Sequence, residues 1–164
     1  MSDSSDAAIT MRPIGWVRSA RGGATDDYWG GTVARIELDP IQFDATALAG
    51  LADFSHVQII YFFDQVNPAT IVTAAEHPRE NPAWPKVGIF AQRKKSRPNR
   101  LGLSTCRLLS VEGLTVTVAE LDAIDGTPVV DIKPYVLEFE PRREDARQPK
   151  WISELMVDYF AKRA

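Results

Sequence analysis

Basic side chains gather in one short central segment of this 164-residue chain, whose formal net charge is −3. Guanidinium and ammonium groups at this density can hold phosphate oxygens through charge-assisted hydrogen bonds. A charge run is equally typical of a solvated loop, but Pro98 and Asn99 within it favour a fixed turn. The segment contains five basic residues: Arg93, Lys94, Lys95, Arg97 and Arg100. We take the following as candidate substrate contacts: Lys94, Lys95, Arg97, Asn99 and Arg100.

A second segment places three ionisable side chains on one face of an extended run. Asp131, Lys133 and Tyr135 alternate with apolar residues, so an acid, a base and a phenol project to the same side. The preceding residues 125–128 read Asp-Gly-Thr-Pro, a sequence that in most proteins only reverses the chain. The row is either an exposed ladder or the wall of a site. We take Asp131, Lys133 and Tyr135 as the candidate catalytic residues.

The histidines and the cysteine offer less chemistry. His56 and His77 lie far apart in the sequence and make a poor metal-binding set, so we predict no metal and no catalytic role for either. The single cysteine, Cys106, excludes an intrachain disulfide and falls within a strand-like run. We expect it to be a small core residue in a cytoplasmic protein.

The elements that must position these residues are mostly short strands. Period-2 alternation or continuous apolar character predicts strands over residues 14–17, 34–38, 57–63, 71–75, 87–91, 102–111 and 114–121. The run 57–63 is nearly all apolar, which is typical of a central strand buried on both faces. Glu112-Gly113 is a tight hairpin signal between the last two strands and predicts antiparallel pairing.

Two helices are expected. Asp44 occupies an N-cap position before the helix-forming run 45–51. Near the C-terminus, apolar residues recur at the spacing of an amphipathic helix that follows Pro149: Ile152, Leu155, Met156, Tyr159 and Phe160.

Composition and length fit one globular domain, with 45% hydrophobic and 25% charged residues. Residues 1–10 are rich in Ser, Asp and Ala, so we predict a disordered tail before a domain of residues 11–164. No apolar run approaches membrane-spanning length, so we expect no membrane contact. Many short strands and few helices predict a mainly β protein, an antiparallel β-barrel with one short helix and a C-terminal amphipathic helix.

At three separated places, in the right order, the chain resembles the TsaA-like family of TrmO-type S-adenosylmethionine-dependent tRNA methyltransferases. The matching residues are Phe54-Ser55-His56 leading into Phe62-Phe63-Asp64-Gln65, then Arg97-Pro98-Asn99 with Leu101-Gly102-Leu103-Ser104, then Leu121-Asp122 with Asp125 to Tyr135. The resemblance covers about residues 14–135.

The resemblance implies a β-barrel that binds S-adenosylmethionine (SAM), works as a homodimer and methylates N6 of threonylcarbamoyladenosine in tRNA. Such a nitrogen must lose its proton, which suits a carboxylate, a Tyr or a neutral Lys. Carried over by position, the cofactor contacts would be Tyr28, Trp29, Gly30, Gly31, Asp64, Gln65, Arg93, Leu103, Ile124, Asp125 and Gly126.

The first loop departs from the family pattern. It reads Asp26-Asp27-Tyr28-Trp29 where family members usually carry Pro-Arg-Gln. A change of this kind affects substrate identity more than cofactor binding, so methylation of another small substrate remains open. Two further alternatives are a non-catalytic SAM-binding module and a nucleic-acid-binding barrel without a small cofactor.

Overall fold

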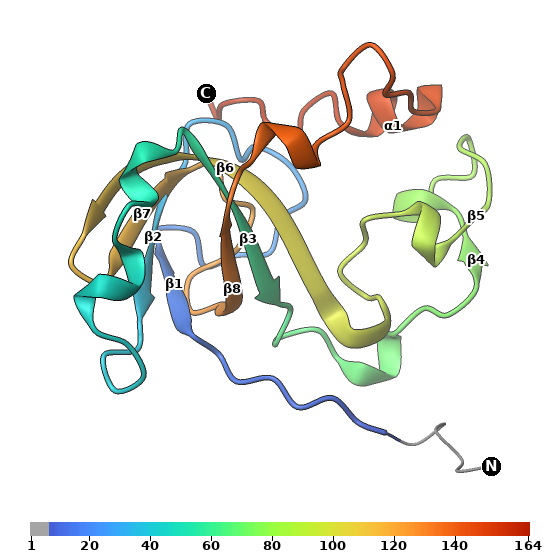
Figure 1. The fold of residues 1–164 in the computed structure, drawn as a ribbon. Helices are drawn as coiled ribbons and strands as arrows, with labels where there is room; N and C mark the ends of the chain where they lie inside the picture. Colours follow the sequence, from blue (N-terminus) through green and yellow to red (C-terminus); the bar gives the residue numbers. More distant parts are fainter. Residues whose placement is uncertain (1–6) are drawn as a thin grey trace, which may run out of the picture.

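The computed structural model describes residues 7–164, and a closed β-barrel forms its centre (Figure 1). The strands follow the order β1-β2-β7-β6-β3-β8 around the barrel, and every neighbouring pair is antiparallel. The predicted antiparallel barrel is confirmed. Its strands are β1 (Gly15–Ser19), β2 (Val33–Leu38), β3 (His56–Phe62), β6 (Leu101–Glu112), β7 (Thr115–Ala119) and β8 (Pro128–Pro134).

The core lies inside the barrel, where alternate residues of each strand meet. In β3, Val57, Ile59 and Tyr61 are buried while the residues between them are only half-buried. The prediction that this strand is buried on both faces is therefore wrong, because a barrel wall turns just one face toward the core. Cys106 is buried as predicted, and burial, with Asp122 and Glu120 nearby, raises the pKa of its thiol to about 12.

The hairpin between β6 and β7 forms where the sequence places it. Glu112 pairs with Thr115, and Gly113 adopts a positive φ of 59°, which glycine tolerates without steric cost. β8 has no counterpart among the predicted strands. It begins at Pro128, and Val129 on its inner face is buried.

Two predicted strands are much shorter than expected. The runs 71–75 and 87–91 contribute only β4 (Ala75–Glu76) and β5 (Val87–Gly88), which form a separate two-stranded sheet. The 3-10 turn Ile89–Ala91 follows β5 directly. Neither run contains a proline, but Pro68 and Pro78 flank the first run and Pro85 precedes the second, and a residue without an N–H group cannot extend a strand ladder.

The helical predictions hold only in part. Asp44 is an N-cap whose carboxylate accepts from Thr46 N at 2.9 Å, but Gly50 (φ 83°) splits the run into two 3-10 turns, Ala45–Leu48 and Leu51–Asp53. At the C-terminus, α1 (Lys150–Leu155) begins directly after Pro149, which occupies the N-cap position without a side-chain hydrogen bond, and Trp151 is buried. Residues 156–160 form turns where the apolar spacing predicts helix.

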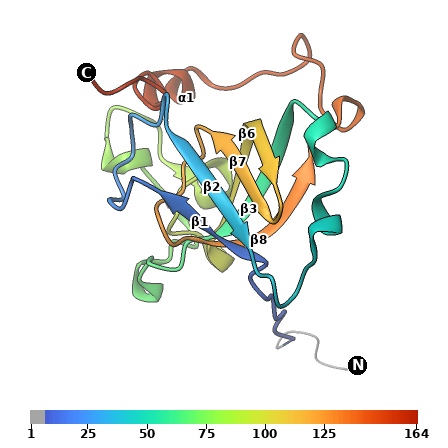
Figure 2. The same ribbon diagram turned by 90° about the vertical axis from the view of Figure 1, so that its left-hand side faces the viewer.

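The C-terminal part of the chain crosses the molecule after β8. Since neighbouring strands are antiparallel, the connections β1–β2, β3–β6 and β7–β8 leave from one end of the barrel, here called the loop end. β8 finishes at the opposite end. Figure 2 shows the following segment passing the 3-10 turn Leu137–Phe139 and returning to α1, beside the β1–β2 loop. Of the predicted disordered tail, residues 1–6 lie outside the described residues.

Candidate functional site

The loops at the loop end contact one another directly. Arg21 O accepts from Asp125 N at 2.8 Å, joining the β1–β2 loop to the β7–β8 loop. The carboxylate of Glu120 accepts from Gly31 N at 3.0 Å, a second link between the same loops. The structure thus brings together two of the segments that carry predicted cofactor contacts.

Arg21 organises the β1–β2 loop from within. Its guanidinium lies 3.5 Å from the centroid of the Trp29 ring and donates to Tyr28 O at 2.9 Å and Asp27 O at 2.6 Å. Burial lowers the pKa of Arg21, and the nearby charge of Arg163 lowers it further. Trp29 is buried, so Arg21 rather than solvent covers the ring, while Tyr28 beside it is exposed.

The long β3–β6 connection is tied to the same loop. Arg79 donates two parallel hydrogen bonds, of 2.8 and 3.0 Å, to the Asp27 carboxylate, and this pairing raises the pKa of Arg79. Arg79 and Tyr28 both hold a positive φ, of 50° and 67°. Non-glycine residues keep this conformation only where the surrounding structure enforces it.

A hydroxyl and carboxylate cluster, made of Tyr61, Ser104, Asp122 and Tyr159, lies next to these loops. The Asp122 carboxylate accepts from Tyr61 at 3.0 Å and also from the hydroxyls of Ser104 and Tyr159. Burial and the Asp122 charge raise the pKa of both tyrosines, so both phenols stay protonated and donate. Sequence reasoning assigned Asp122 no role; its position directly after the predicted strand 114–121 and before the Asp125 turn was the available signal.

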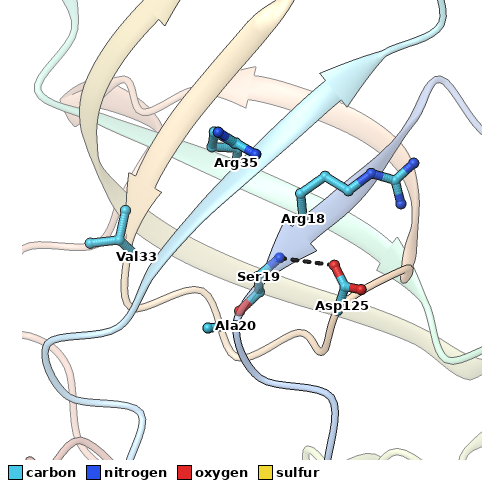
Figure 3. Close-up of a pocket in the computed structure, with 6 residues that line it drawn as sticks. All are labelled: Arg18, Ser19, Ala20, Val33, Arg35 and Asp125. Atoms are coloured by element: carbon cyan, nitrogen blue, oxygen red, sulfur yellow. Dashed lines mark hydrogen bonds between the residues drawn. The ribbon is translucent and has the colours of Figure 1, made fainter.

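An open hollow of about 470 Å³ lies beside Asp125 on the outer surface of β1 and β2 (Figure 3). The carboxylate of Asp125 faces it while accepting from Ser19 N at 3.0 Å. Arg18 and Arg35 line the same hollow. Opposite charges therefore line one space of ligand size, where both guanidinium groups also contact the Glu37 carboxylate, at 3.1 and 3.9 Å.

The other predicted cofactor contacts are placed as follows. Leu103 is exposed and its carbonyl accepts from Arg93, while Ile124 O accepts from the Thr127 hydroxyl at 2.8 Å. Gly126 has a φ of 81° and donates to Val17 O at 2.8 Å. Asp64 and Gln65 are exposed just after β3. Leu103 lies near the start of β6, and the other residues lie on connections at the loop end.

The basic segment is a structured turn, as Pro98 and Asn99 predict. Asn99 has a φ of 61°, and Arg97 donates to Gln92 O at 2.8 Å. Arg100 donates to Val66 O at 3.0 Å and stacks over the Phe62 ring at 4.5 Å. Lys94 pairs with Glu76 at 2.5 Å, whereas Lys95 is exposed. The two lysines thus differ in how freely they can meet a phosphate.

The three catalytic candidates lie apart from these loops. Asp131 and Lys133 form an ion pair of 2.8 Å on the outer face of β8, and this pairing raises the pKa of Lys133. Lys133 lines a different hollow, of about 370 Å³, together with Phe139. The Tyr135 ring lies 6.0 Å from the ring of His56. β8 carries Asp131 and Lys133 away from the loop end, and Tyr135 follows β8 at the opposite end.

The described residues hold no group of three or more His, Cys, Asp or Glu that could bind a metal ion. His56 contacts the Ser55 hydroxyl at 2.8 Å, and His77 contacts Trp84 O at 2.8 Å. Within residues 7–164, none of the helices is long and apolar enough to cross a membrane.

Comparisons with known proteins support the resemblance seen in the sequence. The human protein described as tRNA (adenine(37)-N6)-methyltransferase is 36% identical over 113 residues, 69% of this chain and 24% of that protein. A probable S-adenosyl-L-methionine-binding protein of Methanothermobacter thermautotrophicus is 34% identical over 135 residues, covering 80% of this chain and 93% of the relative. This chain therefore spans about a quarter of the human relative but nearly all of the archaeal one.

Solved structures and a family model agree with these relatives. A crystal structure of TrmO from Pseudomonas aeruginosa has a TM-score of 0.70 at 31% identity, covering 86% of this chain and 61% of that one. The family model for the tRNA-methyltransferase O N-terminal domain matches residues 27–141. Since this match includes well over half of the residues, the chain belongs to the family of the tRNA-methyltransferase O N-terminal domain.

Proposed function

We propose that the protein is a SAM-dependent methyltransferase that methylates N6 of threonylcarbamoyladenosine in tRNA. The observation that carries this proposal is the meeting of the β1–β2 and β7–β8 loops at one end of a barrel whose family match spans residues 27–141. Relatives named as tRNA adenine N6-methyltransferases and as SAM-binding proteins support the reaction and the cofactor.

The residues at the loop end suit the cofactor's chemistry. SAM carries an adenine ring, a sulfonium cation and an amino-acid group with both charges, and it supplies the methyl group. Asp125 can pair with an ammonium group, and Arg18 or Arg35 across the same hollow can pair with a carboxylate. The exposed Tyr28 and Leu103 offer aromatic and apolar surface to a ring.

Protein groups must then align the acceptor nitrogen and keep water away from it. The proposed substrate path is the basic segment, where Lys95 is exposed and where the turn at Pro98–Arg100 fixes the backbone. We propose Asp131, Lys133 and Tyr135 for the proton transfer. Because they lie away from the loop end of their own subunit, this role requires a second subunit to present them.

We further propose a homodimer. The hollow beside Asp125 is open to solvent in one subunit, whereas ligand sites normally enclose 70–90% of a small ligand. A second subunit placed over the loop end would enclose the cofactor.

The decisive experiment joins binding to product analysis. Calorimetry with SAM and S-adenosylhomocysteine tests the cofactor, and mass spectrometry of nucleosides from incubated tRNA tests the reaction. The proposal expects binding of both ligands and a mass gain of one methyl group on threonylcarbamoyladenosine. Methylation of a different nucleoside would retain the enzyme class and correct the substrate.

A non-catalytic SAM-binding module is the second candidate. The archaeal relative that this chain matches over 93% of its length is described only as a SAM-binding protein. This candidate predicts binding of both ligands without methylated product from any tRNA.

A further inference from the structure

The C-terminal segment 158–161 lies against the β1–β2 loop, the first loop of the candidate site. Three backbone amides of that loop donate to it: Tyr28 N to Asp158 O at 3.0 Å, Trp29 N to Tyr159 O at 2.8 Å, and Gly30 N to Ala161 O at 3.2 Å. The family match ends at residue 141, so it assigns these contacts no function. The segment therefore contacts three predicted cofactor residues through backbone alone.

The shape of the loop depends on this segment. A Cβ atom on Gly30 would lie 2.1 Å from Phe160 O, so the close approach of the two backbones requires glycine at this position. Tyr28 beside it holds a positive φ of 67°. Such a conformation persists where neighbouring structure enforces it, and the hydrogen bonds that the loop amides donate to the carbonyls of segment 158–161 supply that restraint.

Tyr159 ties the segment to the barrel. Its hydroxyl donates to the Asp122 carboxylate, which also accepts from Tyr61 of β3 and Ser104 of β6. Ser104 follows Leu103 directly, and Asp122 lies shortly before Asp125. The phenol of Tyr159 thus binds a carboxylate that is near Asp125 in the sequence and that also binds Ser104, the neighbour of Leu103.

The helix before the segment is anchored independently. Trp151 of α1 is buried, and the Trp84 indole N–H donates to the Glu154 carboxylate at 2.9 Å. Loss of the Tyr159 hydroxyl should therefore loosen segment 158–161 without releasing α1.

We propose that segment 158–161 supports the first loop of the cofactor site from outside the hollow, and that Tyr159 is a positioning residue which holds this segment in place through Asp122. The segment orders residues 28–31 before the ligand arrives, and this preorganisation strengthens SAM binding. The inference rests on the proposed function, because it takes SAM as the ligand of these loops.

The test compares Tyr159→Phe with wild type, using Val157→Ala in the same tail as the matched control. Val157 is 73% exposed, so its truncation should leave binding unchanged. Tyr159→Phe removes one hydrogen bond to a charged group. We expect it to raise the dissociation constants of SAM and S-adenosylhomocysteine about tenfold, measured by calorimetry below the onset of melting.

Hydrogen exchange gives a readout that does not need the ligand. In wild type the amides of Tyr28, Trp29 and Gly30 should exchange slowly. Tyr159→Phe should raise their exchange rates by a larger factor than it raises those of the barrel strands. A chain ending at Val157 should lose both this protection and SAM binding. If that chain does not fold, Tyr159→Phe still decides the question.

Three outcomes would overturn the proposal. Equal dissociation constants for wild type and folded Tyr159→Phe would show that the segment does not support the site. Tighter binding by the chain ending at Val157 would show that the segment occupies the place of the ligand. Unprotected wild-type amides at 28–30 would show that it does not order the loop. If wild type binds neither ligand, the proposed function fails instead, and the exchange data still decide whether the segment orders the loop.

Discussion

The Asp125 carboxylate can serve the turn and the ligand. It accepts a hydrogen bond from Ser19 N, and it faces the hollow that Arg18 and Arg35 also line. Replacing it with Ala removes both the hydrogen bond and the charge, while replacing it with Asn keeps an acceptor for Ser19 N. We expect Asp125→Ala to weaken SAM binding by about 1 to 3 kcal/mol and Asp125→Asn to weaken it by somewhat less. Calorimetry on folded variants measures both. Full affinity in Asp125→Asn would mean that the turn, not the charge, serves the ligand.

Substitution of Asp131 distinguishes an effect on methyl transfer from an effect on cofactor binding. The residue lies on the outer face of β8, paired with Lys133, away from the hollow beside Asp125. If it accepts the proton of the acceptor nitrogen, Asp131→Asn should lower the rate constant of methyl transfer about a hundredfold and leave SAM affinity unchanged. Single-turnover assays measure this effect. Full activity in Asp131→Asn would show that another group accepts the proton. Asp122 is then the carboxylate at the loop end to substitute next.

The basic segment as an element should serve tRNA rather than the cofactor. Lys94→Ala combined with Lys95→Ala should weaken tRNA binding and flatten its salt dependence by about one unit per lost phosphate contact, with SAM affinity nearly intact. Lys95 should carry the larger share, because Lys94 is already paired with Glu76. Arg93→Ala should weaken both tRNA binding and SAM binding, since Arg93 also donates a hydrogen bond to Leu103 O.

Filter binding across a salt series measures these effects. Lys150→Ala is the matched control, because Lys150 is an exposed lysine on α1, outside the basic segment. Wild-type tRNA affinity in the double lysine variant would show that the segment is not the substrate path.

For the whole molecule we expect a symmetric dimer of the 18.2 kDa chain. The open hollow and the remote position of Asp131 both need a second subunit if they are to form one enclosed site. Light scattering should give twice the chain mass at high concentration. A monomer that still methylates tRNA at full rate would contradict this assembly and would leave Asp131 without access to the reacting atoms.

The barrel could be predicted from the sequence because the signals for its strands and turns are local. Period-2 alternation and the Glu112-Gly113 turn each involve residues within a few positions of one another. The basic turn and the Asp125 loop were found for the same reason, since charge, Gly and Pro mark them directly. The helix predictions failed for two different reasons. Gly50, with a φ of 83°, divides one run locally, whereas tertiary hydrogen bonds from the amides of residues 28–30 hold the turns that follow α1.

Only the tertiary structure decided which side chains share the site. Asp122 meets Tyr61 across 61 positions of sequence and Tyr159 across 37, pairings that barrel closure and the returning C-terminal segment create. The same closure explains why Asp131 and Lys133, two residues apart on β8, lie away from the loops that are near them in the sequence. Strand periodicity fixes the face on which a residue lies, whereas its neighbours across the sheet depend on how distant segments pack.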